Sequence, residues 1–162
     1  MHVSWPARGS TDMAGHGASS WRRPEFFIRA EHVALVLLLS ALVLWHADNV
    51  SWLRFASAFA AIDLVGYLPG AISCRMTKRG RISPLYYFLY NVAHSYLTAG
   101  VVVAVWAIAL GHLEWAMLAL PIHLSGDRGL FGNTYKSTSL PFEGPAGASA
   151  GGGLVQTRDG RS

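Results

Sequence analysis

The chain has 162 residues, enough for one domain, and a formal net charge of +4. Apolar residue types make up 52% of it and charged types only 14%, which is about half the charged fraction of an average soluble domain. The basic residues form short clusters without interleaved aromatic residues, which excludes nucleic acid as an expected partner, and the single cysteine, Cys74, excludes an internal disulfide.

Four long apolar segments lie between two polar ends. Residues 1–24 are rich in small residues without periodicity, as are residues 137–162, and both are predicted to be disordered tails. Each segment is near the roughly 20 residues that cross a bilayer. They are Phe26–Trp45, Trp52–Ile72, Pro84–Leu110 and Trp115–Phe131. The sequence therefore predicts an all-α fold, a polytopic membrane bundle of four transmembrane helices over residues 25–136. The alternative is a soluble helical domain, but no segment has the charged face that such a domain needs.

The positions of lysine and arginine predict the orientation of these helices in the cell membrane. Basic residues flank the first segment, fill the loop between the second and third, and follow the fourth. They are Arg22, Arg23, Arg29, Arg75, Lys78, Arg79, Arg81, Arg128 and Lys136. The turns at residues 46–50 and 111–114 contain none. Both termini are therefore expected in the cytoplasm.

Ionisable residues of all four segments fall in one half of the predicted membrane. At about 1.5 Å per helical residue, they lie roughly 8–15 Å from the cytoplasmic end, with Asp127 closer to it. They are Glu31, Asp63, His94, His123 and Asp127. His123 and Asp127 are four residues apart and share a helical face. An ionised side chain that faces lipid costs several kcal/mol, so these faces are expected to point toward one another.

The same residues carry a resemblance to a family of small four-helix membrane proteins of unknown function, domain family four-two-six-zero. The resemblance covers about residues 29–136 and rests on their order along the chain. The matching residues are Glu31, Asp63, Gly66, Tyr67, Tyr90, Asn91, His94, Ser95, His123, Asp127, Arg128 and Lys136. It implies the membrane topology and this residue set, and it implies no reaction.

The chemistry of these residues favours an intramembrane enzyme that acts on a lipid-soluble substrate. Carboxylates in a medium of low dielectric can act as general acids near neutral pH, and histidines can move protons. We therefore predict four catalytic residues, Asp63, His94, His123 and Asp127. Glu31, Tyr67, Tyr90, Asn91 and Arg128 are predicted to bind the substrate. Proton-initiated isomerisation or cyclisation of an isoprenoid would suit such acids among aromatic rings.

Three alternatives remain open at this stage. No cofactor is predicted, although two histidines with two or three carboxylates are enough ligands for a metal-dependent hydrolase. The close-spaced motifs His-Glu-x-x-His and Glu-x-x-His, which would favour a metal, are missing from the sequence. A small proton-coupled transporter, working as a homo-oligomer, is the second alternative, and a structural assembly subunit is the third. The expected partner is a membrane lipid or another hydrophobic small molecule.

Overall fold

The computed structural model describes residues 24–77 and 82–143, and within these ranges the chain is helical and has no β-strand. Most of both predicted tails lies outside these ranges, as do Arg22, Arg23, Lys78, Arg79 and Arg81. The elements are α1 (Pro24–Trp45), η2 (Ala47–Asn49), α2 (Trp52–Gly66), α3 (Leu68–Met76), α4 (Pro84–Ala93), α5 (Tyr96–Leu110), η3 (Trp115–Leu118), α6 (Ala119–Gly126) and η4 (Asp127–Phe131). The prediction of an all-α fold is confirmed for the described residues.

Two helical stretches, Glu25–Trp45 and Trp52–Met76, are long and apolar enough to cross a membrane. The pair α4 and α5 passes the same test together but is bent by 59°, so it adds a third span only if the pair counts as one. The fourth predicted span, Trp115–Phe131, is divided into the 3-10 turn η3, the eight-residue helix α6 and the π-helical turn η4. The described residues therefore hold two or three candidate membrane spans, which is consistent with a membrane protein.

The prediction of one continuous helix over Pro84–Leu110 is wrong, because the chain leaves the helical path at His94 and Ser95. Ser95 has an extended backbone (φ −96°, ψ 133°), and its hydroxyl accepts a hydrogen bond from the amide of Leu97 at 3.2 Å. A serine in this position offers the next helix an N-cap, which competes with continuation of the preceding helix. The break turns α5 away from α4.

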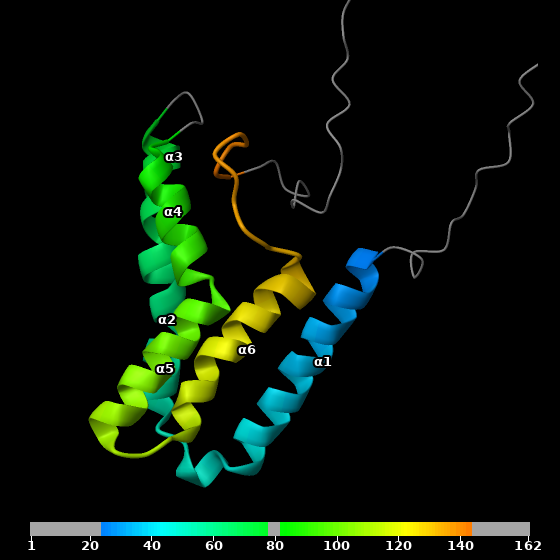
Figure 1. Ribbon diagram of the computed structural model, residues 1–162, viewed down its shortest axis with the longest axis vertical. Helices are drawn as coiled ribbons and strands as arrows, with labels where there is room; N and C mark the ends of the chain where they lie inside the picture. The colour runs from blue at the N-terminus through cyan, green and yellow to red at the C-terminus, as the bar shows by residue number, and fades with distance from the viewer. Residues whose placement is uncertain (1–23, 78–81, 144–162) are drawn as a thin grey trace, which may run out of the picture.

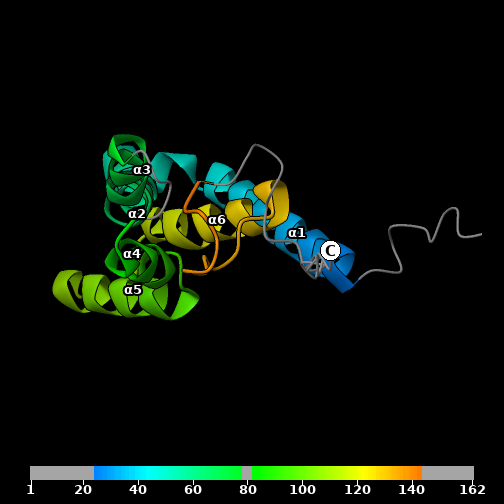
Figure 2. The same ribbon diagram turned by 90° about the horizontal axis from the view of Figure 1, so that it is seen from above.

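Helix α6 is the central element of the bundle. It lies between α1 on one side and the group formed by α2 and α5 on the other, as both views show (Figures 1 and 2). Its Leu120 and Leu124 pack with Ile62 and Ala99, while Ile122 packs with Val43. Because these helices surround α6, none of its residues is exposed.

The helical segments alternate in direction along the chain. The beginning of α1, the end of α3, the beginning of α4 and the turn η4 lie at one end of the bundle, and η2 lies at the other (Figure 1). At the η2 end, Arg54 of α2 forms an ion pair with Glu114 at 2.7 Å, and His46 stacks on Trp115. These contacts tie the two turns of that end together.

The first residues of the predicted C-terminal tail are ordered. The C-terminal strap (residues 132–143) runs back over α3 and α4, and the side chain of Phe142 is only 1% exposed. Its ring fits over Gly70, where a Cβ atom would collide with it, and packs edge-on against Tyr87 and Tyr90. The prediction of disorder from Ser137 is therefore wrong for Ser137–Glu143, because Phe142 has an apolar site to fill; residues 144–162 lie outside the described part.

Hydrogen bonds fix this strap to α4 at two further points. The Asn91 side-chain amide donates to the Lys136 carbonyl at 2.9 Å, and the Lys136 amide donates to Asn91 Oδ1 at 2.7 Å. The Tyr87 hydroxyl donates to the carbonyl of Leu140 at 2.8 Å. The strap has no regular secondary structure, so these bonds give its backbone some of the hydrogen-bond partners that a helix or a sheet would otherwise supply.

We expect Phe142→Ala to lower the free energy of unfolding by about 3 kcal/mol, because it empties a closely packed site. Leu140→Ala is the matched control, since the Leu140 side chain is 44% exposed and only its backbone carbonyl is used. Thermal unfolding in detergent, followed by circular dichroism, measures both variants. Equal midpoints for the two variants would contradict the anchoring role of Phe142.

Candidate functional site

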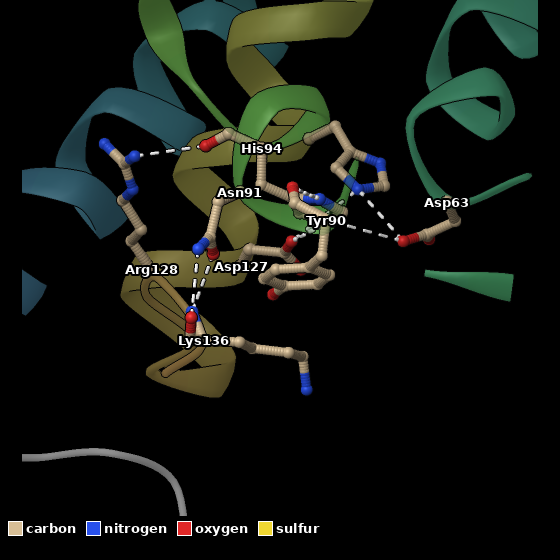
Figure 3. A network of polar contacts seen from close by, with 8 residues as sticks. Asp63, Tyr90, Asn91, His94, Asp127, Arg128 and Lys136 are labelled. Carbon is tan, nitrogen blue, oxygen red and sulfur yellow. Dashed lines mark hydrogen bonds and ion pairs between the residues drawn. The ribbon is translucent and has the colours of Figure 1, made fainter. Parts of the chain in front are cut away.

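Four of the predicted site residues converge on one place. The His94 Nε2 atom lies 3.2 Å from Asp127 Oδ2 and 3.4 Å from Asp63 Oδ1. The His123 Nε2 atom lies 3.7 Å from each of the same two oxygens. Figure 3 shows Asp63 reaching across from α2 to His94, which stands at the end of α4. We call Asp63, His94, His123 and Asp127 the His–Asp cluster.

The His–Asp cluster is closed on most sides and open on one. The side chains of His94, His123 and Asp127 are 6%, 5% and 18% exposed, whereas that of Asp63 is 52% exposed. Phe59 lies one turn before Asp63 on α2, and its ring meets the His123 ring edge-on at 4.6 Å. The cluster is therefore reached beside Asp63, past an apolar side chain.

The helix break sets the position of His94. Its Nδ1 atom lies 3.0 Å from the carbonyl oxygen of Tyr90, and its ring stacks on the Tyr90 ring at 4.0 Å. A carbonyl oxygen only accepts, so Nδ1 carries the hydrogen of this bond and Nε2 faces the two carboxylates. On the other side, Gly66 gives the ring room: a Cβ there would lie 3.1 Å from His94 and 2.6 Å from the Cβ of Ala93.

Arg128 supports the break rather than standing free for a ligand. Its guanidinium donates to the carbonyl of His94 at 3.2 Å, and it stacks over the rings of Tyr96 at 4.4 Å and Tyr135 at 5.5 Å. The break leaves the His94 carbonyl without a helical partner, and such a group inside a membrane bundle needs another donor. Arg128 supplies that donor.

The other predicted substrate-binding residues have different positions. Tyr90 is buried against His94, while the Asn91 side chain holds the strap. The Tyr67 hydroxyl donates to Glu143 Oε1 at 3.0 Å, so it also contacts the strap. Glu31 is exposed on α1, and within residues 24–77 and 82–143 no hydrogen bond or ion pair joins it to the cluster. The structure thus brings Tyr90 to the cluster and leaves Glu31 outside it.

Sequence reasoning missed a second polar contact beside the cluster. Tyr96 Oη lies 2.7 Å from the Ser125 hydroxyl and 3.3 Å from His32 Nδ1, and Ser125 is fully buried. These contacts join α5 to α6 and α1. Ser125 is two residues from both His123 and Asp127, so it points away from the face that those two share, and the one-face pattern gave no signal for it.

Aromatic side chains of the strap and of α4 lie around the ammonium of Lys136. Its ammonium donates to the carbonyl of Phe142 at 2.7 Å and lies 4.6 Å from the Phe142 ring and 4.8 Å from the Tyr90 ring. Burial lowers the pKa of Lys136 below its ordinary value of 10.5, and the negative charges of Glu143 and Asp127 oppose that change. The strap therefore buries a cation against the ring that stacks on His94.

No family model, no curated protein and no solved structure matches this chain. The resemblance to the four-helix family therefore stays a prediction.

Gly66→Ala is expected to push His94 out of place and to destabilise the protein by about 1–3 kcal/mol, as overpacking does. The new Cβ would overlap Ala93 on α4 and press on the imidazole. Gly100→Ala is the matched control, because a Cβ there meets nothing within 4 Å. Thermal unfolding in detergent compares the variants, and a Gly66→Ala protein as stable as the Gly100→Ala protein would contradict the close approach of α2 and α4.

The partly buried Lys136 makes the free energy of unfolding depend on pH, and the direction of its pKa change sets the sign of that dependence. Because its pKa is lower in the folded chain than in the unfolded chain, the unfolded chain binds more protons between the two pKa values. The free energy of unfolding should therefore rise with pH through this alkaline range, up to about pH 10.5, and lie at its lower level at neutral pH. We expect the unfolding midpoint of the natural protein, measured relative to Lys136→Met, to rise as the pH is raised from neutral toward 10.5. A constant or falling difference would contradict the burial of the ammonium.

Proposed function

We propose that this protein is an intramembrane enzyme that carries out acid–base chemistry on a lipid-soluble substrate at the His–Asp cluster. The observation that carries the proposal is the convergence of two buried histidines and two carboxylates from three helical segments on one point. Ionisable groups in a membrane segment are costly, and they gather where protons, ions or substrates are handled.

The proposal includes four membrane passes, with α6 and its two flanking turns as the last. These 17 residues, Trp115–Phe131, would extend about 25 Å at the rise of a helix, which is close to the thickness of the hydrocarbon layer. The lysine and arginine bias would place both termini in the cytoplasm of the cell, with the cluster in the cytoplasmic half of the membrane. Membership of the four-helix family that residues 29–136 resemble is part of the same proposal.

The open side of the cluster supports a lipid-soluble substrate. Asp63 is the exposed member, and its neighbours on the surface of α2 include the exposed side chains of Phe59 and Leu64. A molecule that reaches Asp63 must therefore pass apolar side chains, which favours an isoprenoid or another lipid over a water-soluble compound. Isomerisation or cyclisation of such a substrate needs a proton donor and an acceptor in one site, and a carboxyl group and an imidazole can serve as the two.

Lipid mass spectrometry can test this function. The purified natural protein is incubated in detergent with a total lipid extract, and all lipid-soluble species are separated by chromatography and compared before and after, because isomerisation and cyclisation change retention without changing mass. We expect at least one species to be converted, and we expect Asp63→Asn and His123→Gln to slow its conversion about 100-fold or more. Both substitutions keep the size and the hydrogen-bonding capacity of the side chain, and circular dichroism checks the helical fold.

Asp48→Asn and His112→Gln are the matched controls, since both residues lie outside the cluster and are exposed. They should convert the same species at the natural rate. If the cluster variants match these controls, or if the natural protein converts no species, the cluster is structural and the enzymatic proposal fails.

A further inference from the structure

His123 is a buried imidazole without a hydrogen bond in the described part of the chain. It is 5% exposed, and neither of its ring nitrogens has a hydrogen-bond partner among residues 24–77 and 82–143. Buried polar atoms in proteins are nearly always paired, and leaving one unpaired costs about 1–3 kcal/mol. Its Nε2 atom faces the space between Asp63 Oδ1 and Asp127 Oδ2, at 3.7 Å from each, so whatever completes this imidazole lies in that space.

His94 offers a second nitrogen to the same space. Its Nδ1 hydrogen is committed to the Tyr90 carbonyl, which leaves the Nε2 lone pair of the neutral ring directed at two carboxylate oxygens. A lone pair and two carboxylates repel one another unless a proton or a cation lies between them. A metal-binding histidine typically has this arrangement, with one nitrogen on the metal and the other hydrogen-bonded to a backbone carbonyl.

The distances favour a metal ion over a proton. A charge-assisted hydrogen bond between an imidazolium and a carboxylate is about 2.7–2.9 Å long, whereas the four contacts in the cluster measure 3.2–3.7 Å. Ligand atoms bound tetrahedrally to zinc at about 2.0–2.1 Å are separated from one another by about 3.4 Å. Asp63, His94 and His123 can also place one ligand atom each within 4.8 Å of the other two.

The charge of the cluster agrees with a divalent cation. Two carboxylates beside two neutral imidazoles carry two negative charges within a largely buried site, and the ammonium of Lys136 and the guanidinium of Arg128 are engaged by other groups. A divalent cation would cancel both charges. Two imidazole nitrogens and a carboxylate oxygen are donors that suit a first-row transition metal such as zinc, iron or manganese.

We propose that the His–Asp cluster binds a divalent transition-metal ion, with His94 and His123 as nitrogen ligands, Asp63 as an oxygen ligand and the Asp127 carboxylate beside them. This inference rests on the proposed function and deepens it. The ion is approached from the exposed side at Asp63, where it would act as a Lewis acid on an oxygen of the lipid-soluble substrate.

Metal analysis of the purified protein tests this inference without an activity assay. The natural protein is purified in detergent without chelator, and its zinc, iron and manganese are measured by mass spectrometry. We expect a divalent metal close to one ion per chain, or the same amount of zinc after incubation with zinc and removal of the excess. Cobalt(II), bound in place of the metal, should give the visible absorption of a tetrahedral site.

Ligand variants locate the ion. We expect His94→Gln and His123→Gln to bind zinc at least about 100-fold more weakly, while His46→Gln and His112→Gln keep the natural affinity. Asp63→Asn guards against misfolding, because the Asp63 side chain is 52% exposed and the amide has the same size as the carboxylate. This variant should also bind zinc more weakly. A natural protein that takes up no stoichiometric metal, or His123→Gln protein that binds zinc as tightly as the natural one, overturns the inference.

The outcomes also separate this inference from the proposed function. Stoichiometric metal without conversion of any lipid supports the metal site and overturns the enzymatic proposal. Lipid conversion that persists after complete removal of metal by a chelator supports acid–base catalysis by the side chains alone and overturns the metal inference.

Discussion

A backbone carbonyl that a helix break leaves inside an apolar bundle must find a donor, and the carbonyl of His94 finds it in the guanidinium of Arg128. This hydrogen bond joins the α4–α5 break to η4, the segment that also carries Asp127. The contact that stabilises the break thus also brings the carboxylate of Asp127 to the buried imidazole of His94. Without the break, His94 would be one more residue along a straight helix.

Small residues make the convergence sterically feasible. Gly66 lets α2 approach α4, so that Asp63, one turn earlier, comes within reach of His94. Gly129 has the same function between η4 and α1, since a Cβ there would lie 2.8 Å from the backbone nitrogen of Val33. The positions of the two aspartates therefore depend on two glycines, Gly66 and Gly129, whose closely packed neighbours leave no room for a larger side chain.

The sequence predicted the cluster better than it predicted the helices that form it. Asp63, His94, His123 and Asp127 could be placed in one layer because depth along a helix follows from residue number alone. The break at Ser95 was missed, since serine inside an apolar segment is common and its local bond to the Leu97 amide is not visible as a pattern. The donor that the freed His94 carbonyl finds, Arg128, lies 34 residues away along the chain. Phe142 was missed for a related reason: a single aromatic residue in a polar segment has no periodicity, and only the space over Gly70 gives it a site.

The order of the cluster residues along the chain has a consequence for biogenesis. Asp63 and His94 precede their partners on α6 and η4 along the chain, so they are synthesised before them. Until α6 and η4 are made and pack against the earlier helices, Asp63 and His94 lack these partners, and unpaired ionisable groups in an apolar bundle are costly. Packing of α6 between α1 and the α2–α5 group is then the step that pairs these polar groups, so the stability of the earlier helices depends on a segment that is made after them.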